Sequence, residues 1–251
     1  MNVFPWMVLW TLMMAFAFPG GYGPRSASAQ QSSGAGQSAE QLPPDIRPET
    51  LSRMPRAKRD DFATDAEKQA FDRVMARSPK QSVSRWLGPT GTRLQIPELA
   101  AVYQEQINMI RDKSGLEPKY RELTILVATR ESESKDEWFD HEPDGIELLS
   151  AKVVDIIRNK QDTKGLEEKT AAIIQFGREL FREPKVSSKT FANLERNFGR
   201  RTALGITLLM SYYAQSGLLM RVYDQHMDTR PECVQGHMGC DTRKRSLSSI
   251  W

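Results

Sequence analysis

The chain is poor in the residues on which many short enzyme motifs depend. Its 251 residues include 2 cysteines and 3 histidines, and 35 basic residues nearly balance 32 acidic ones. The resulting net charge of +3 gives no basic surface of the kind that binds nucleic acid. A glycine-rich phosphate loop, a GxSxG elbow, an HExxH zinc motif and a CxxC redox motif are all absent from the sequence. These absences count against the enzyme classes that carry those motifs.

The N-terminus has the pattern of an export signal. Residues 3–18 are almost wholly apolar and uncharged, and Ala27-Ser28-Ala29 supplies a small-x-small cleavage site. We therefore predict a signal peptide over residues 1–29 and an exported protein, periplasmic or secreted. The alternative is an uncleaved membrane anchor, although the run is shorter than the usual span of about 20 residues and contains Pro5. Residues 30–61, rich in Gln, Ser, Gly, Pro and Arg, are expected to form a flexible leader.

Both cysteines, Cys233 and Cys240, fall in the C-terminal segment 229–251, which has no periodicity and is expected to be an irregular tail. In an exported protein such a close pair typically forms a disulfide, and this is our prediction. Free thiols are one alternative. A metal site with His226 and His237 is another, but the spacing fits no standard zinc finger, so we expect no metal.

The segment between leader and tail has helical periodicity and no convincing strand or hairpin, which predicts one all-α domain over residues 62–228 with seven or eight helices. Apolar residues recur at helical spacing over 65–77, from Pro97 to 110, and from Pro118 to 130. A loop is expected around Gly88, Pro89 and Gly91. A further helix after residue 134 is expected to be interrupted or ended by Pro143 and Gly145.

Capping residues mark the later helices. Ser150 is a candidate N-cap, a long amphipathic helix is expected over 166–181, and Ser187 or Ser188 can cap a helix that ends at Gly199. The last helix, 203–223, is apolar nearly all round. Such a helix is expected to be buried, either at the centre of the domain or at a subunit interface.

One short segment carries a candidate site. Ser134, Glu137 and His141 stand at i, i+3 and i+7, so they share one face if the segment is helical. A carboxylate one turn from a histidine can act as an acid/base pair, because each group orients and tunes the other. The alternative from spacing alone is a weak Glu–His pair on a solvated surface.

The chain resembles the carboxymuconolactone decarboxylase family, relatives of alkyl hydroperoxidase D, over residues 95–225. The similar segments are RELTILVATR at 121–130, DEWFDHEP at 136–143 and GRELFREPKVSSKTFANLERNFG at 177–199. The resemblance implies a compact helical bundle of the alkyl hydroperoxidase D-like type. It also implies a homo-oligomer, a trimer or a multiple of it, and a small-molecule substrate with no nucleic acid. Membrane contact is expected only through an uncleaved signal.

The hydroperoxidase branch carries a glutamate, two cysteines and a histidine at positions that Glu122, Ser134, Glu137 and His141 occupy here. Both cysteines are replaced, so the thiolate that attacks a peroxide and the thiol that resolves the sulfenic acid are missing. Alkyl hydroperoxidase or peroxiredoxin-type activity is therefore only a family-level alternative. A non-catalytic helical oligomer that binds a small ligand is a second alternative.

The decarboxylase-like branch implies cofactor-free decarboxylation, or related proton transfer, on a small lactone or carboxylic acid. On this resemblance His141 is the proton donor and acceptor, Glu122 and Glu137 orient it, and Ser134 completes the catalytic set. For the remaining residues, three alternatives stay open. Arg121 and Arg130 either hold a substrate carboxylate or lie on the surface. Trp138 is either a wall of the pocket or a core residue. Tyr212 and Tyr213 either pack in the core or at a subunit interface, or bring a hydroxyl to the pocket.

Overall fold

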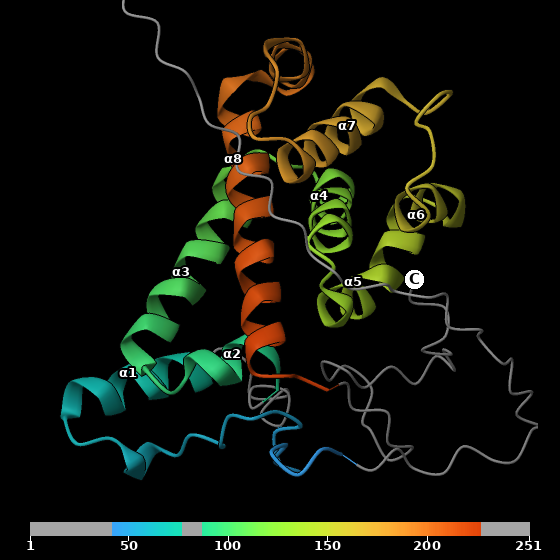
Figure 1. The fold of residues 1–251 in the computed structure, drawn as a ribbon. Helices are drawn as coiled ribbons and strands as arrows, with labels where there is room; N and C mark the ends of the chain where they lie inside the picture. The colour runs from blue at the N-terminus through green and yellow to red at the C-terminus, as the bar shows by residue number, and fades with distance from the viewer. Residues whose placement is uncertain (1–41, 77–86, 227–251) are drawn as a thin grey trace, which may run out of the picture. The chain divides into compact units, whose positions relative to one another are not determined.

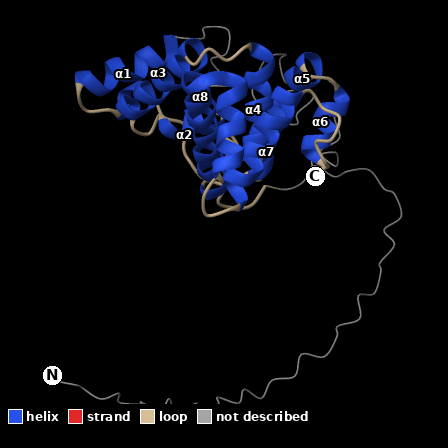
Figure 2. Ribbon diagram, turned by 90° about the horizontal axis from the view of Figure 1, so that it is seen from above, coloured by secondary structure: helices blue, strands red, loops and turns tan. Residues whose placement is uncertain are grey.

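The computed structural model describes residues 42–76 and 87–226 (Figure 1). The predicted signal peptide, the first part of the leader and the tail with both cysteines lie outside the described residues, so the predictions made for them stay predictions. Every regular element in the described ranges is a helix, as Figure 2 shows, apart from one isolated bridge between Arg47 and Ser52. The predicted all-α class is confirmed.

Within the described ranges, eight α-helices follow one 3₁₀ turn, η1, at Arg59–Asp61. In chain order they are α1 (Asp65–Ala76), α2 (Gly88–Arg93), α3 (Pro97–Lys113), α4 (Pro118–Glu131), α5 (Lys135–Leu148), α6 (Ala151–Arg158), α7 (Glu168–Arg182) and α8 (Ser188–Val222).

Local signals set many of the helix ends as the sequence predicts. Pro97 and Pro118 stand in the first turns of α3 and α4, where a missing N–H costs nothing. The hydroxyls of Ser150 and Ser187 accept hydrogen bonds from the N–H groups three residues on, at 3.4 and 3.3 Å. Gly199, with φ of +74°, breaks the long helix α8 at the predicted position.

Three segments differ from the sequence-based expectation. The expected loop around Pro89 is the short helix α2, because proline suits a first helical turn. Helix α5 continues through Pro143 to Leu148 instead of stopping, because close packing on α4 holds it: a Cβ at Gly145 would collide with Leu126. Part of the expected flexible leader also packs on the domain, where the N–H of Arg53 donates to the carbonyl of Tyr223 at 2.8 Å.

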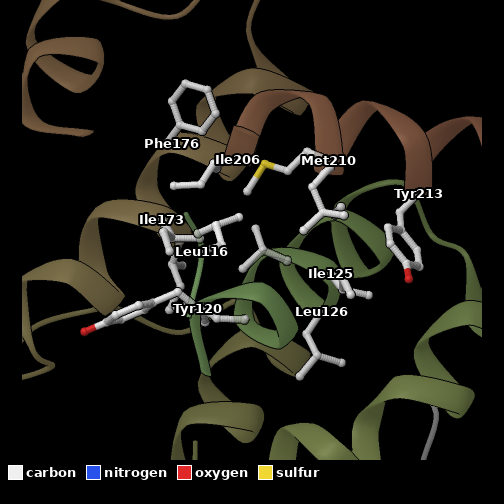
Figure 3. Close-up of a cluster of buried hydrophobic side chains, with 14 of the residues drawn as sticks. Leu116, Tyr120, Ile125, Leu126, Ile173, Phe176, Ile206, Met210 and Tyr213 are labelled. Atoms are coloured by element: carbon white, nitrogen blue, oxygen red, sulfur yellow. The ribbon is translucent and has the colours of Figure 1, made fainter. Parts of the chain in front are cut away.

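Helix α4 is the centre of the domain and contacts α5, α6, α7 and α8. It is buried on nearly all sides over residues 120–129, so its neighbours fix each of its side chains. Figure 3 shows side chains of α4, α7 and α8 meeting in the main apolar cluster, with Tyr213 at its edge. A second, smaller cluster joins Phe71 and Val74 of α1 to Leu94 and Ala100.

Residues 203–223, within α8, were expected to be buried at the domain centre or at a subunit interface, and in the single chain one face of this segment is buried while another is exposed. Ile206, Leu209 and Met210 are fully buried, but Leu204 and Leu218 are 59% and 57% exposed. Exposed positions recur at 204, 208, 211, 215, 218 and 222, a heptad spacing that runs along one face. Within the described residues α8 is also the one helix long and apolar enough to cross a membrane, yet half of its apolar window is buried in the domain. The buried half makes α8 a core helix.

Candidate functional site

The central contact of the candidate site joins two helices. Glu122 of α4 and His141 of α5 meet with 2.8 Å between the Glu122 Oε2 and the His141 Nδ1. Their side chains are 9% and 17% exposed, so the pair is largely shielded from water while His141 keeps some access. Close packing of α4 on α5 brings together residues 19 positions apart. The surface-pair alternative for His141 is therefore wrong.

Two further helices extend the contact into a chain of four residues, which we call the proton relay: Glu122, His141, Tyr213 and Arg111. The Tyr213 hydroxyl of α8 lies 3.1 Å from the Nε2 of His141. The guanidinium of Arg111, from α3, donates to the same hydroxyl oxygen. Each end of the imidazole therefore has a partner, a carboxylate on one side and a phenol on the other.

The relay can hold a mobile proton in two forms. When the imidazole is neutral with its proton on Nδ1, Nδ1–H donates to Glu122 and Nε2 accepts from the Tyr213 hydroxyl. When the imidazole is protonated, both ring nitrogens donate, and the tyrosine oxygen can accept from His141 and from Arg111 together. Neither form requires the side chains to move, which is the property that a proton-transfer site needs.

Electrostatics favours the protonated form of His141. Burial alone lowers the pKa of this imidazole, but its hydrogen bond to the Glu122 carboxylate and the nearby negative charges outweigh burial, so that the pKa is raised. The Tyr213 hydroxyl behaves differently: burial raises its pKa, opposed by Arg111, and keeps the phenol protonated. Of the two groups, the imidazole is therefore the one whose protonated form the surroundings stabilise.

Glu137 has a different role from the one its spacing predicts. It lies one turn before His141 and is 4% exposed, but no hydrogen bond or ion pair joins it to another described residue. Burial raises the pKa of Glu137 to about 7, against a smaller opposing effect of His141. The hydrogen-bonded carboxylate partner of His141 is Glu122, and Glu137 contributes to His141 through its charge alone.

The remaining predicted residues divide into two groups. Ser134 is the N-cap residue of α5, but its hydroxyl makes no capping bond, and its buried Oγ has no partner among the described residues. Arg121 stays near the relay, with its Nε 3.9 Å from the Oε1 of Glu122.

Arg130 and Trp138 are associated with Arg158 instead. The Arg130 Nε donates to the carbonyl of Arg158 at 2.6 Å. Trp138 is fully buried, with the Arg158 guanidinium 5.7 Å from its ring centroid. These contacts favour the alternatives that the sequence left open, a structural role for Arg130 and a core position for Trp138.

The sequence patterns missed Arg111 and the nearby Arg93, which contacts Tyr212, and they named Tyr213 only as one of several alternatives. Arg111 directly follows the apolar residues Ile107 and Ile110 on α3. An arginine beside an apolar stripe is the sequence feature that could have marked Arg111 as a site residue. Tyr213 was expected in the core, an interface or the pocket, and it is both core and site. Arg93 had no signal, because the segment around it was expected to be a loop.

Across the ranges that the structure covers, no three His, Cys, Asp or Glu side chains gather in an arrangement that could hold a metal ion. The chain matches no family model, no curated protein and no solved structure in the three comparisons made with known proteins.

Proposed function

We propose that the protein is a cofactor-free proton-transfer enzyme of the carboxymuconolactone decarboxylase type, acting on a small lactone or carboxylic acid. The observation that carries the proposal is the proton relay, in which a shielded imidazole is held between Glu122 and Tyr213. Glu122 and His141 also stand at the glutamate and histidine positions of the family pattern, which supports the same conclusion.

In the proposed reaction the substrate's carboxylate leaves as CO₂, and the electron pair of the broken C–C bond passes into a conjugated carbonyl of the substrate. The protonated imidazole of His141 then supplies the proton that the resulting carbanion needs, and Tyr213 passes it on from Nε2. Glu122 stabilises the imidazolium before the transfer. The cycle closes when the imidazole takes a proton from solvent, to which His141 is 17% exposed.

The experiment is a proton-exchange and decarboxylation assay on the purified protein. Lactone acids and unsaturated carboxylic acids are incubated in D₂O, and NMR follows both deuterium uptake at carbon and loss of the carboxyl group. General acid/base catalysis contributes about 10²–10⁴-fold, so the His141→Gln variant should be slower by at least about 100-fold.

His226→Gln is the matched control, because His226 is the other described histidine and has no contact with the relay. It should keep activity within about threefold of the parent. Absence of turnover on every such acid, or equal turnover by parent and His141→Gln, would contradict the proposal.

The peroxidase alternative has no support at this site, because Ser134 and Glu137 stand where thiols are required. Export and self-association stay predictions. The exposed heptad face of α8 supports self-association, since a monomer leaves Leu204 and Leu218 in water.

A further inference from the structure

Arg93 is a buried cation without an anionic partner. It lies in α2 and is 8% exposed. One terminal nitrogen donates to the Ser216 hydroxyl at 3.0 Å, and the other donates to the Tyr212 hydroxyl at 3.3 Å. The guanidinium lies over the Tyr103 and Tyr212 rings, 4.8 and 5.2 Å from their centroids. All of these partners are neutral, and no carboxylate of the described chain lies within ion-pair distance of Arg93.

The unused donors of Arg93 have the geometry that a carboxylate requires. A guanidinium carries five N–H donors, and Ser216 and Tyr212 use one each. The Nε is buried and has no hydrogen-bond partner within the part of the chain that the structure describes. Nε–H and a remaining N–H of a terminal nitrogen form a side edge that binds the two oxygens of a carboxylate in parallel.

Other buried polar atoms short of partners lie around the same part of α8. Ser216 binds Arg93, and its neighbour Gly217 packs so closely on Ser134 that a Cβ there would lie 2.9 Å from the Ser134 Oγ. That Oγ is buried and unpartnered, as is the Nε of Arg111 in the relay. Buried polar groups in folded proteins are nearly always hydrogen-bonded, so these atoms are the places where ordered water or a polar ligand would bind.

Glu137 does not complete this group of contacts. It is near enough for Arg93 to oppose the rise of its pKa, but burial and other charges dominate and raise that pKa to about 7. Near neutral pH this carboxyl is therefore only partly charged.

We propose that Arg93, with Ser216 and Ser134, forms a binding subsite for the carboxylate group of a small organic acid. The inference deepens the proposed function, because the subsite lies beside the relay residue Tyr213 through Tyr212. Cofactor-free decarboxylation requires a conjugated group on the substrate as electron sink, so the acid that we infer has a flat, conjugated body. A carboxylate can pair with the side edge of the guanidinium through its two oxygens.

The test measures binding and does not depend on turnover. The purified full-length chain is titrated with benzoate, with its neutral analogue benzamide and with sulfate, and calorimetry or NMR gives each affinity. We expect benzoate to bind at least about tenfold more tightly than benzamide, which lacks the charge-assisted bidentate contact, and than sulfate, which lacks the apolar ring.

The variants separate the subsite from the rest of the protein. Arg93→Lys keeps the charge but removes the side edge, and should weaken benzoate binding by about tenfold or more. Ser134→Ala should weaken it by a few-fold, and remains informative if Arg93→Lys fails to fold by circular dichroism. Arg200→Gln, whose side chain is 89% exposed, is the matched control and should bind benzoate as the parent does.

Several outcomes would overturn the subsite. These are no benzoate binding at millimolar concentration, equal affinity for benzoate and benzamide, equal affinity for benzoate and sulfate, or unchanged affinity in a folded Arg93→Lys or Ser134→Ala variant. His141→Gln distinguishes the two proposals. It should bind benzoate within about threefold of the parent even where it loses proton exchange. A parent protein that binds benzoate but catalyses neither proton exchange nor decarboxylation of any acid tested would leave the subsite standing and the proposed function refuted.

Discussion

The Glu137→Gln substitution should remove most of the folding stability that the parent protein loses through this side chain as pH rises. The side chain is 4% exposed, and burial raises the pKa of its carboxyl from 4.5 to about 7. The folded protein therefore binds a proton in a pH range where the unfolded chain has released it. Since the folded-state pKa is the higher one, the stability associated with this group is complete below pH 4.5 and is lost as pH rises through about 7.

The magnitude follows from the two pKa values. They differ by 7 − 4.5, or about 2.5, and each whole pKa step corresponds to about 1.4 kcal/mol. The ionised carboxylate thus costs the folded state roughly 3 kcal/mol above neutral pH. Glutamine has the same shape and no charge to desolvate. The free energy of unfolding of the variant, relative to that of the parent, should therefore rise by about 3 kcal/mol from acid to alkaline pH, within a factor of two.

Urea denaturation of parent and variant at about pH 4.5, 6, 7 and 8.5 measures this difference directly. Asp136, whose pKa burial and then Asp140 raise to about 7, contributes to the pH dependence of both proteins and cancels in the comparison. Glu147→Gln, an exposed position on the same helix, is the control and should follow the parent. If the free energies of unfolding of parent and Glu137→Gln change in parallel with pH, the reasoning about this buried carboxyl is refuted.

Three further substitutions test the surroundings of the site. Tyr213→Phe should lower turnover by at least about tenfold and cost about 1–3 kcal/mol in urea denaturation, because it leaves Arg111 without its hydroxyl partner; equal turnover would remove Tyr213 from the relay. Gly217→Ala should lower the unfolding free energy by about 1–2 kcal/mol, since its Cβ would lie 2.7 Å from the Ser134 Cβ; a more stable variant would show that this approach is loose. Leu218→Glu should shift sedimentation toward the monomer if the exposed face of α8 joins copies of the chain, and a monomeric parent would end that prediction.

Helix positions were largely predictable because their signals are local. Pro97 and Pro118 near helix starts, Ser150 as a cap and Gly199 as a break act through their own backbone geometry, and each acts as expected. The stretch around Pro143 was not predictable in this way. Its helix continues because Gly145 lets α5 approach Leu126 of α4, and no local pattern records which helices will pack together.

The site was predictable only in part for the same reason. Spacing placed Glu137 and His141 on one face, yet the hydrogen bond to His141 comes from Glu122 on another helix. The family resemblance brought Glu122 into the set, whereas Tyr213 and Arg111 joined it through the packing of α8 and α3. The all-round apolar character of residues 203–223 was also ambiguous, because apolar residues on an outward face look the same in sequence as those in a core.

The most direct test of the account is an NMR titration of His141 in the parent and in Glu122→Gln, with His226→Gln used to assign the signals. The account predicts that the pKa of His141 lies above 6.5 in the parent, because Glu122 and its neighbours outweigh burial. In Glu122→Gln the largest favourable contribution is gone, so the pKa of His141 should fall below that of the parent. A parent pKa at or below 6.5, or one that Glu122→Gln leaves unchanged, would contradict the claim that Glu122 holds a proton on His141.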